Sequence, residues 1–319
     1  MKQRPLIVFL TGGLGNQLFQ LANALTLDHD RDVLLEWKLG KPRCGEQGLP
    51  DIMSFKLPKR VKLFEGTRYS YFASKTVGFI LRSGIAPKKW EKKSIVMQTL
   101  FSLCNLVLTI HFRQPIKVLR GSGIGYSPSI KSQSYNFLIG YFQSYRFMSD
   151  FQSYKDMQLL SLTHENPEIK KLRGIAKKEN PIVVHFRLGD YKSETAFGIP
   201  TTSYYNSAIF KLISKYPNST IWAFSDDEKE ARSIFPSGYM QKVRWFTDKK
   251  LSSAETLEIM RLGKSYVIAN STFSWWGAVL SKTENPSVVC PDNWFRFQAE
   301  PLDLIPPSWT RVLAWEKTL

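Results

Sequence analysis

The sequence contains no segment apolar enough to cross a bilayer, which takes about 18 uninterrupted apolar residues, so we expect no transmembrane helix. Its three cysteines, Cys44, Cys104 and Cys290, are odd in number and widely spaced, and no CxxC pair occurs. This usage argues against a disulfide framework and a thiolate metal site, and it favours a reducing compartment. The apolar run at 6–10 follows a basic start but is too short for a signal peptide, so we expect a first core strand there.

What the chain does contain suits an α/β enzyme. With 319 residues and a 43% hydrophobic composition it can form two cores, and we expect domains at 1–160 and 161–319. The second half alternates strand-like segments at 181–186, 220–224, 243–246, 266–269 and 287–290 with helical segments at 204–215, 228–235, 254–262 and 275–280. The first half begins in the same way, with a strand at 6–10, a helix at 16–27 and a strand at 33–36. This alternation predicts parallel sheets covered by helices on both faces.

The net charge of +17 is concentrated in the first half. Residues 41–131 hold 17 lysines and arginines against four acids, a net charge of +13, and they include an apolar stretch at 95–112. One interpretation is a face that lies on anionic lipid, where each nearby cation contributes about 1 kcal/mol. The other is a core helix surrounded by solvated lysines, and the sequence favours neither. Nucleic acid is a third interpretation, but no nucleic-acid-binding motif is present and the aromatic residues are not interleaved with the basic ones.

Three short motifs each follow an apolar run of strand length. They are Gly12-Gly13-Leu14-Gly15-Asn16-Gln17, His185-Phe186-Arg187-Leu188-Gly189-Asp190-Tyr191 and Asn270-Ser271-Thr272-Phe273-Ser274. In an open parallel sheet, ligands bind where strands end and helices begin. Glycines, a cation, a carboxylate and hydroxyls at three such junctions predict a site for a phosphorylated ligand.

The first motif leaves two alternatives open. Gly13 and Gly15 after a strand, with Glu36 at the end of the next strand, resemble a dinucleotide-binding fingerprint, as in a nicotinamide-dependent oxidoreductase. However, Leu18 occupies the third glycine position, and no Gly-Lys-Ser/Thr follows the turn as a P-loop requires. The turn could also be purely structural, with Asn16 as the N-cap of the next helix.

In the middle motif, Arg187 offers a planar fork suited to two oxygens of a diphosphate. His185 and Asp190 lie close to it in sequence. The alternative is an ion pair between Arg187 and Asp190 that only closes the loop. Asp226 and Asp227, after the predicted strand at 220–224, either bind a base or ribose or cap the next helix.

In the late motif, Ser271, Thr272 and Ser274 precede a predicted helix, so hydroxyls and backbone N–H groups can face an anion. The alternative is that one serine caps the helix. For Trp275 and Trp276 we favour packing in the core.

Together, GGLGNQLFQ at 12–20, GYFQSYRF at 140–147, HFRLGDY at 185–191, FSDD at 224–227 and IANSTFSWWGA at 268–278 resemble the α-1,2-fucosyltransferases of glycosyltransferase family 11. Their order and spacing match from residue 11 to about residue 295, whereas 45–125 carry little family signal. The resemblance implies a GT-B fold, in which two Rossmann-like domains face each other across a cleft. It also implies GDP-fucose as donor, held mainly by the second domain, no metal or other cofactor, and inverting transfer of L-fucose to the 2-hydroxyl of a galactose.

The resemblance also assigns residues. Its catalytic candidates are His185, Arg187, Asp190 and Asn16, with His185 and Asp190 both open as the group that accepts the proton of the acceptor hydroxyl. Its donor-binding candidates are Gly13, Gly15, Asn16, His185, Arg187, Asp226, Asp227, Glu255, Asn270, Ser271, Thr272, Phe273 and Ser274. Arg187 and hydrogen-bond donors at 270–274 would offset the negative charge that grows on the leaving GDP.

Two positions depart from the family pattern. The family usually has a second arginine where this chain has Leu188, so one positive charge near the donor is missing, and we expect Leu188→Arg to tighten GDP binding. The family also usually has an aspartate at the position of Thr256, and in related fucosyltransferases that acid contacts the guanine. Either the neighbouring Glu255 substitutes for it or the contact is weaker.

The resemblance further implies a role in surface polysaccharide or O-antigen synthesis, with a galactose-containing and in some cases lipid-linked oligosaccharide as acceptor and no nucleic acid partner. We expect a cytoplasmic enzyme, peripheral on the inner face of the plasma membrane, with the basic insertion 41–131 facing the lipid. The alternative outside enzymology is a non-catalytic basic module that binds membrane or nucleic acid.

Overall fold

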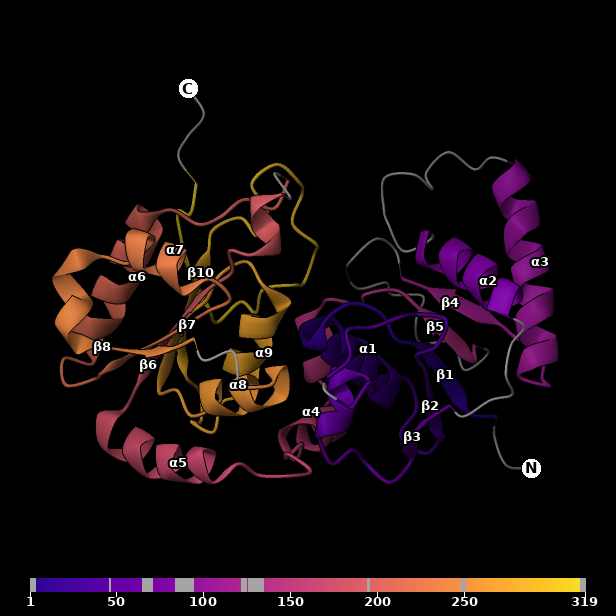
Figure 1. Ribbon diagram of the computed structural model, residues 1–319, viewed down its shortest axis with the longest axis horizontal. Helices are drawn as coiled ribbons and strands as arrows, with labels where there is room; N and C mark the ends of the chain where they lie inside the picture. Colours follow the sequence, from indigo (N-terminus) through magenta and orange to yellow (C-terminus); the bar gives the residue numbers. More distant parts are fainter. Residues whose placement is uncertain are drawn as a thin grey trace. The chain divides into compact units, whose positions relative to one another are not determined.

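The computed structural model describes residues 4–45, 47–64, 71–83, 95–121, 125, 135–193, 196–247 and 251–315 (Figure 1). The chain forms two compact units, which are described separately. Unit 1 comprises Met1–Leu160 and Pro301–Ile305, and unit 2 comprises Ser161–Glu300 and Pro306–Leu319. Parts of the basic insertion 41–131, among them Lys88, Lys89, Lys92 and Lys93, lie outside the described residues.

Unit 1 is built on a parallel sheet with the strand order β3-β2-β1-β5-β4. Its strands are β1 (Leu6–Phe9), β2 (Val33–Glu36), β3 (Val61–Leu63), β4 (Val118–Arg120) and β5 (Phe137–Ile139). Its helices are α1 (Leu14–Leu27), α2 (Tyr71–Ser83), α3 (Ile95–His111) and α4 (Phe151–Gln158), with short 3-10 turns at Asp51–Ser54 and Tyr145–Met148.

The centre of unit 1 is β1, whose four residues are all buried. Ile7 and Phe9 belong to one apolar cluster with residues of α2 and α3, among them Leu81 and Leu108. Because successive side chains of a strand point to opposite faces, Leu6 and Val8 face the other side of the sheet. A strand that is apolar on both faces is typical of a parallel sheet with helices on each side.

Unit 2 contains a second parallel sheet, with the order β11-β10-β9-β6-β7-β8. Its strands are β6 (Ile182–Phe186), β7 (Ile221–Ser225), β8 (Val243–Phe246), β9 (Ser265–Val267), β10 (Ser287–Pro291) and β11 (Thr310–Val312). Its helices are α5 (Pro167–Glu179), α6 (Thr202–Lys215), α7 (Glu228–Ile234), α8 (Ser253–Met260) and α9 (Thr272–Val279), with 3-10 turns at Asp190–Lys192 and Ser237–Lys242.

The predicted α/β class is confirmed. The predicted GT-B architecture consists of two parallel-sheet units in one chain, and the structure contains two such units. Several predicted boundaries were wrong. The first helix begins at Leu14 rather than at 16, the strand expected at 266–269 ends at Val267, and the helix expected at 275–280 begins at Thr272. The last of these helices starts early because the Ser271 hydroxyl accepts a hydrogen bond from the backbone N–H of Phe273 and so caps its first turn.

Each sheet has one strand at which the direction of strand addition reverses. In unit 1 the chain leaves β1 toward β2 and later returns to β5 on its other side. In unit 2 it leaves β6 toward β7 and β8 and returns to β9 on the opposite side. Ligands of open α/β sheets bind beyond the carboxyl ends of the strands at such reversal points. The first motif follows β1, and the middle motif follows β6.

Candidate functional site

The middle motif places Arg187 directly beyond the end of β6, where two carboxylates hold it. One of its terminal nitrogens lies 2.8 Å from Asp190 Oδ2 and the other lies 3.0 Å from Asp226 Oδ2. The second oxygen of Asp226 accepts a 2.9 Å hydrogen bond from the backbone N–H of Leu188. A side chain at Gly189 would bring a Cβ within 2.9 Å of Asp226, so the glycine permits this approach. The predicted ion pair with Asp190 is therefore present, and β7 supplies a second partner.

Tyr191 links the middle motif to the late one. Its hydroxyl donates a 2.9 Å hydrogen bond to the carbonyl of Asn270, and its ring centre lies 5.7 Å from the guanidinium carbon of Arg187. The side-chain nitrogen of Asn270 donates to the carbonyls of Phe197 and Gly198, at 3.0 and 3.2 Å. The Asn270 amide N–H groups are therefore engaged within the protein, while its buried Oδ1 has no hydrogen-bond partner.

Tyr191 was not among the predicted site residues. The signal for it was its place in the middle motif, directly after Asp190 at the start of a turn. A partly buried aromatic ring with a hydroxyl at its tip is suited to packing against a guanidinium and bonding to a neighbouring loop at the same time. Burial raises the pKa of Tyr191, so the hydroxyl stays protonated and donates.

His185, the last but one residue of β6, is only 5% exposed. Burial lowers its pKa to about 4, and the charge of Arg187 acts in the same direction while Asp226 opposes it. The ring is therefore neutral at neutral pH. Its Nδ1 has no hydrogen-bond partner, and its ring centre lies 5.9 Å from that of Phe273. A buried polar atom of this kind usually has a partner, so Nδ1 is available to a ligand.

The late motif forms the start of α9 at the carboxyl end of β9. Ser271 caps the helix and Thr272 is its first residue, so the positive end of the helix dipole lies at this edge of the sheet. Ser274 is fully buried, and its hydroxyl donates to the carbonyls of Ala269 and Ser271 at 3.3 and 3.1 Å. Ser274 thus stabilises the turn, and the expectation that its hydroxyl faces an anion does not hold in this structure.

Three further side chains of the motifs belong to the core. Trp275 and Trp276 are fully buried, which confirms the packing role favoured for them. Leu188 is also fully buried, in the same apolar cluster as Phe186 and Tyr205. An arginine at this position would enter that cluster rather than the donor site. This reverses the expectation that Leu188→Arg tightens GDP binding.

The two aspartates after β7 have separate roles. Asp227 caps α7, accepting a 3.1 Å hydrogen bond from the backbone N–H of Glu230, and it lies 2.9 Å from the ammonium of Lys192. The capping alternative is therefore confirmed for Asp227. Asp226 instead partners Arg187.

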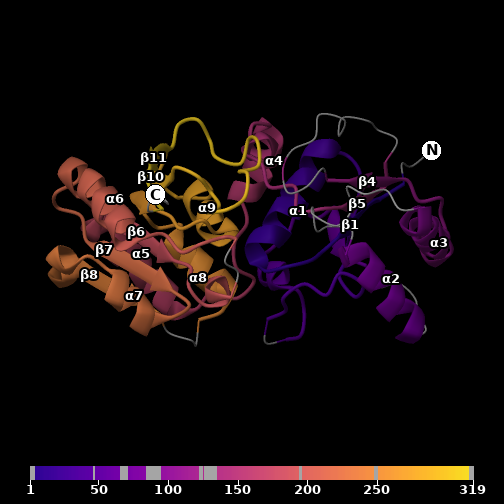
Figure 2. The ribbon, with the colours of Figure 1, turned by 90° about the horizontal axis from the view of Figure 1, so that it is seen from above.

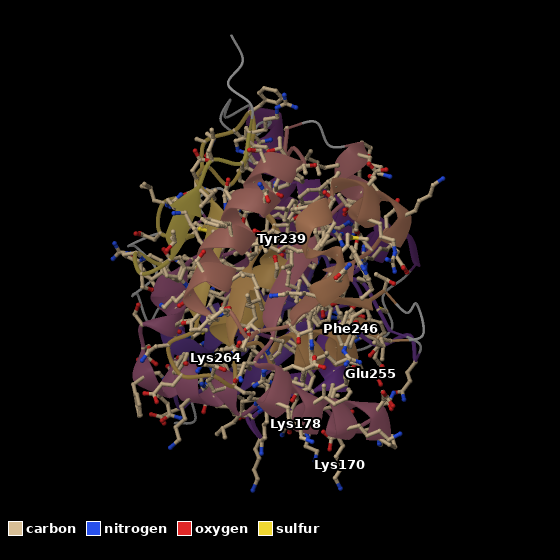
Figure 3. The ribbon with its side chains drawn as sticks, turned by 90° about the vertical axis from the view of Figure 1, so that its left-hand side faces the viewer. Lys170, Lys178, Tyr239, Phe246, Glu255 and Lys264 are labelled. Atoms are coloured by element: carbon tan, nitrogen blue, oxygen red, sulfur yellow. The ribbon has the colours of Figure 1, made fainter. Side chains whose placement is uncertain are left out.

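Glu255 belongs to a capping box at the start of α8. One of its oxygens accepts hydrogen bonds from the backbone N–H and the hydroxyl of Ser252, both at 2.9 Å. The other accepts a 3.2 Å bond from the side chain of Asn166. In the view of Figure 3, Glu255 lies between Phe246, at the end of β8, and Lys170 of α5. Both oxygens have protein partners, so a contact with guanine would have to compete with them; that contact stays a prediction.

In unit 1, the glycine turn leads directly into α1. Gly12 has a φ of 77°, in the left-handed region, and Gly13 is the N-cap. Asn16 and the buried Gly15 lie within the helix, so the alternative that made Asn16 the N-cap was wrong. Asn16 Oδ1 instead accepts a 3.0 Å hydrogen bond from Gln143, which joins the first motif to the GYFQSYRF segment after β5.

Two buried glutamines of α1 hold the loops around this turn. Gln17 donates to the carbonyl of Arg43 and accepts from the backbone N–H of Ile52, each at 3.0 Å. Gln20 donates to the carbonyl of Gly140, also at 3.0 Å. The sequence motif indicated no separate role for Gln17, whereas in the structure both glutamines position the loops around the turn.

Arg187 and the N-terminus of α9 lie at the ends of adjacent strands, and an anion with two neighbouring oxygens can bind there if it displaces a carboxylate from the Arg187 fork. Within the described ranges, no group of three or more His, Cys, Asp or Glu side chains is arranged to hold a metal ion. Gly13, Gly15 and Asn16 lie in unit 1, while the other predicted site residues lie in unit 2.

Comparisons with known proteins find one matching family model and several similar glycosyltransferases. A family model described as Glycosyl transferase family 11 matches residues 116–311. An alpha-1,2-colitosyltransferase of Escherichia coli is 27% identical over 320 residues, covering 95% of this chain and 97% of that protein. The O-antigen biosynthesis glycosyltransferase WbnK of Escherichia coli is 32% identical over 174 residues, covering 50% and 55%. Among solved structures, fucosyltransferase NodZ from Bradyrhizobium has a TM-score of 0.48 at 14% identity, covering 88% of this chain and 93% of that one.

Proposed function

The chain belongs to glycosyl transferase family 11, and from this premise we propose that it transfers L-fucose from GDP-fucose to the 2-hydroxyl of a terminal galactose, with inversion at the anomeric carbon. Membership of the family makes it a glycosyltransferase. The donor, the linkage and the acceptor are the proposal. The name of the relative WbnK supports a place in O-antigen synthesis.

The observation that carries the proposal is the preorganised Arg187. Its fork is held by Asp190 and Asp226 at the reversal point of the unit 2 sheet, next to the N-terminus of α9. During transfer, negative charge grows on the leaving GDP while the sugar carbon becomes cationic. A guanidinium and a helix N-terminus that are already in place stabilise this charge without reorganisation at the moment of reaction.

Donor binding and proton transfer are connected through Asp190. A diphosphate that engages Arg187 competes with its two carboxylates, and Asp190, 54% exposed, is the more easily released. Its carboxylate then lies beside the reacting atoms, where it accepts the proton of the acceptor hydroxyl. His185 is only 5% exposed and thus less open to an acceptor than Asp190, so we assign it to binding rather than to proton transfer.

A second donor is favoured by one specific finding. The relative that aligns over 95% of this chain is named as a colitosyltransferase. Colitose is L-fucose without the hydroxyl at C3, so the two sugars present the same ring and the same anomeric chemistry. GDP-colitose is therefore the second candidate donor, and it is tested beside GDP-fucose.

The test begins with the nucleotide. GDP should raise the melting temperature of the purified protein far more than ADP or NAD, because a ligand that binds only the folded state stabilises it. Stabilisation by NAD with none by GDP would refute the assignment in favour of an oxidoreductase.

The second step measures turnover. The protein is incubated with GDP-fucose or GDP-colitose and a panel of galactosides, and products are identified by mass spectrometry and linkage analysis. We expect a product substituted at the 2-hydroxyl of galactose. We also propose that the reaction needs no metal, so turnover should be equal with and without EDTA. A product linked through another hydroxyl would overturn the proposed linkage, and no product with any galactoside would overturn the proposed acceptor.

A further inference from the structure

Helix α3 (Ile95–His111) is unusual for a surface helix because it contains no Lys, Arg, Asp or Glu. Its inner side packs into the core of unit 1, where Cys104 and Leu108 are buried in one cluster with Val77 and Leu81 of α2. The interpretation of 95–112 as a core helix therefore accounts for one side of α3. The outer side needs a separate explanation.

The outer side of α3 carries apolar side chains as well. Leu103, Leu106 and Ile110 are 55%, 58% and 69% exposed, and their spacing of three and four residues places them on one stripe. Helix α2 packs against α3 and lies beside it in Figures 1 and 2, and it carries a further exposed apolar residue, Phe79, at 66%. We call these four residues the α2–α3 apolar face. A helix packed on a soluble domain normally turns charged and polar residues outward, and contiguous exposed apolar side chains mark a contact surface.

The segment that carries this face is basic in sequence. Arg113 and Lys117 follow α3 directly and are exposed. Residues 71–121 contain nine lysines and arginines and a single acid, Glu91. No helix among the described residues is long and apolar enough to cross a membrane. The combination fits a partner that offers both an apolar layer and negative charge.

We propose that the α2–α3 apolar face docks unit 1 onto the surface of an anionic phospholipid membrane. The four apolar side chains would enter the boundary between head groups and acyl chains, which interfacial segments reach to a depth of about 5–10 Å. The exposed cations beside them would lie at the level of the lipid phosphates. A second copy of this chain is a poorer partner for the same face, because pairing it with itself would bring like charges together.

The experiment measures flotation of the full-length protein with vesicles. One set contains phosphatidylglycerol mixed with phosphatidylcholine, and the other contains phosphatidylcholine alone. We expect flotation with the anionic set at low salt and release at high salt, because salt screens surface charges beyond about 10 Å at 0.1 M. The measurement does not depend on the donor or the acceptor, so its outcome is separate from that of the proposed reaction.

Two variants and a control locate the contact. Leu103→Ser/Leu106→Ser/Ile110→Ser should abolish flotation, and Arg113→Gln/Lys117→Gln should weaken it, by roughly fivefold for each cation removed. The control is Phe210→Ser, which removes a side chain that is 62% exposed on α6 of unit 2 and should float like the wild type. The charge variant leaves the apolar face intact, so the test stands even if the triple variant is unstable.

Three results would overturn the proposal. The first is a wild type that does not float with anionic vesicles at low salt. The second is a folded triple variant that floats as well as the wild type. The third is a wild-type dimer that becomes a monomer in the triple variant while neither protein floats, which would identify the face as an interface between two copies.

Discussion

Replacing Leu188 by arginine tests whether the middle motif is oriented as the structure has it. The even-numbered residues from Ile182 to Leu188 all belong to the apolar cluster that α6 covers, while His185 and Arg187 point to the other side. Leu188 is fully buried and cannot change sides without displacing the backbone N–H that it donates to Asp226. We therefore expect Leu188→Arg to destabilise the protein and to bring no gain in GDP affinity.

The magnitude follows from two contributions. Losing the buried leucine costs about 1.5–3 kcal/mol of apolar burial. Placing an unpaired guanidinium in the cluster costs several kcal/mol more. Together they approach the roughly 5–15 kcal/mol by which a domain is normally stable, so the variant should be largely unfolded or should melt far below the wild type.

Urea denaturation followed by tryptophan fluorescence measures the change, with two matched variants at the same position. Leu188→Met should cost less than about 1.5 kcal/mol, and Leu188→Ala about 2–5 kcal/mol. GDP binding is measured by calorimetry on whatever variants remain folded. A Leu188→Arg protein that is as stable as the wild type and binds GDP more tightly would refute the reasoning. It would mean that the side chain at 188 reaches the donor.

Three further predictions concern the residues around the anion site. Arg187→Ala should lower kcat by about 10²–10³, the usual scale for losing one preorganised hydrogen-bond donor. Arg187→Lys should recover only part of this loss, because an ammonium lacks the planar fork of a guanidinium. A near-normal kcat in the alanine variant would mean that Arg187 only forms ion pairs and does not act in the reaction. Tyr191→Phe removes the hydrogen bond to Asn270 but keeps the ring beside Arg187. It should therefore destabilise the protein by about 1 kcal/mol and raise KM for the donor more than it lowers kcat. An unchanged KM would show that Tyr191 has no role in positioning the donor site. The pKa of His185 is about 4 in the folded protein, below its ordinary value of 6.5. Between pH 4 and pH 6.5 the unfolded state therefore binds more protons than the folded state, so the stability of the fold should fall as the pH drops through this range. Unfolding titrations of His185→Gln should show a shallower fall than the wild type, and since His111 has the same pKa direction, only the difference between the two proteins is diagnostic.

The resemblance to a family and the alternation of strands and helices were sufficient to predict the class of the fold and the position of the motifs at the ends of strands. The front half was harder to predict. The apolar stretch at 95–112 was compatible with a core helix or a lipid-facing one, and α3 has one side buried in the core and one side with exposed apolar residues. Periodicity cannot separate these cases, because a helix without Lys, Arg, Asp or Glu has no charged face to mark its outer side.

Local chemistry explains what the sequence by itself determined. Glycines in the turn after β1, a serine before α9 and an acid before α7 act on neighbouring residues of the chain, so their effect is independent of the rest of the molecule. The tertiary structure decided which side chains meet. Asp226 reaches Arg187 because β7 pairs with β6, and Gln143 reaches Asn16 because β5 pairs with β1. Strand order brings together residues that are 38 or more positions apart, and no local pattern specifies which strands become neighbours.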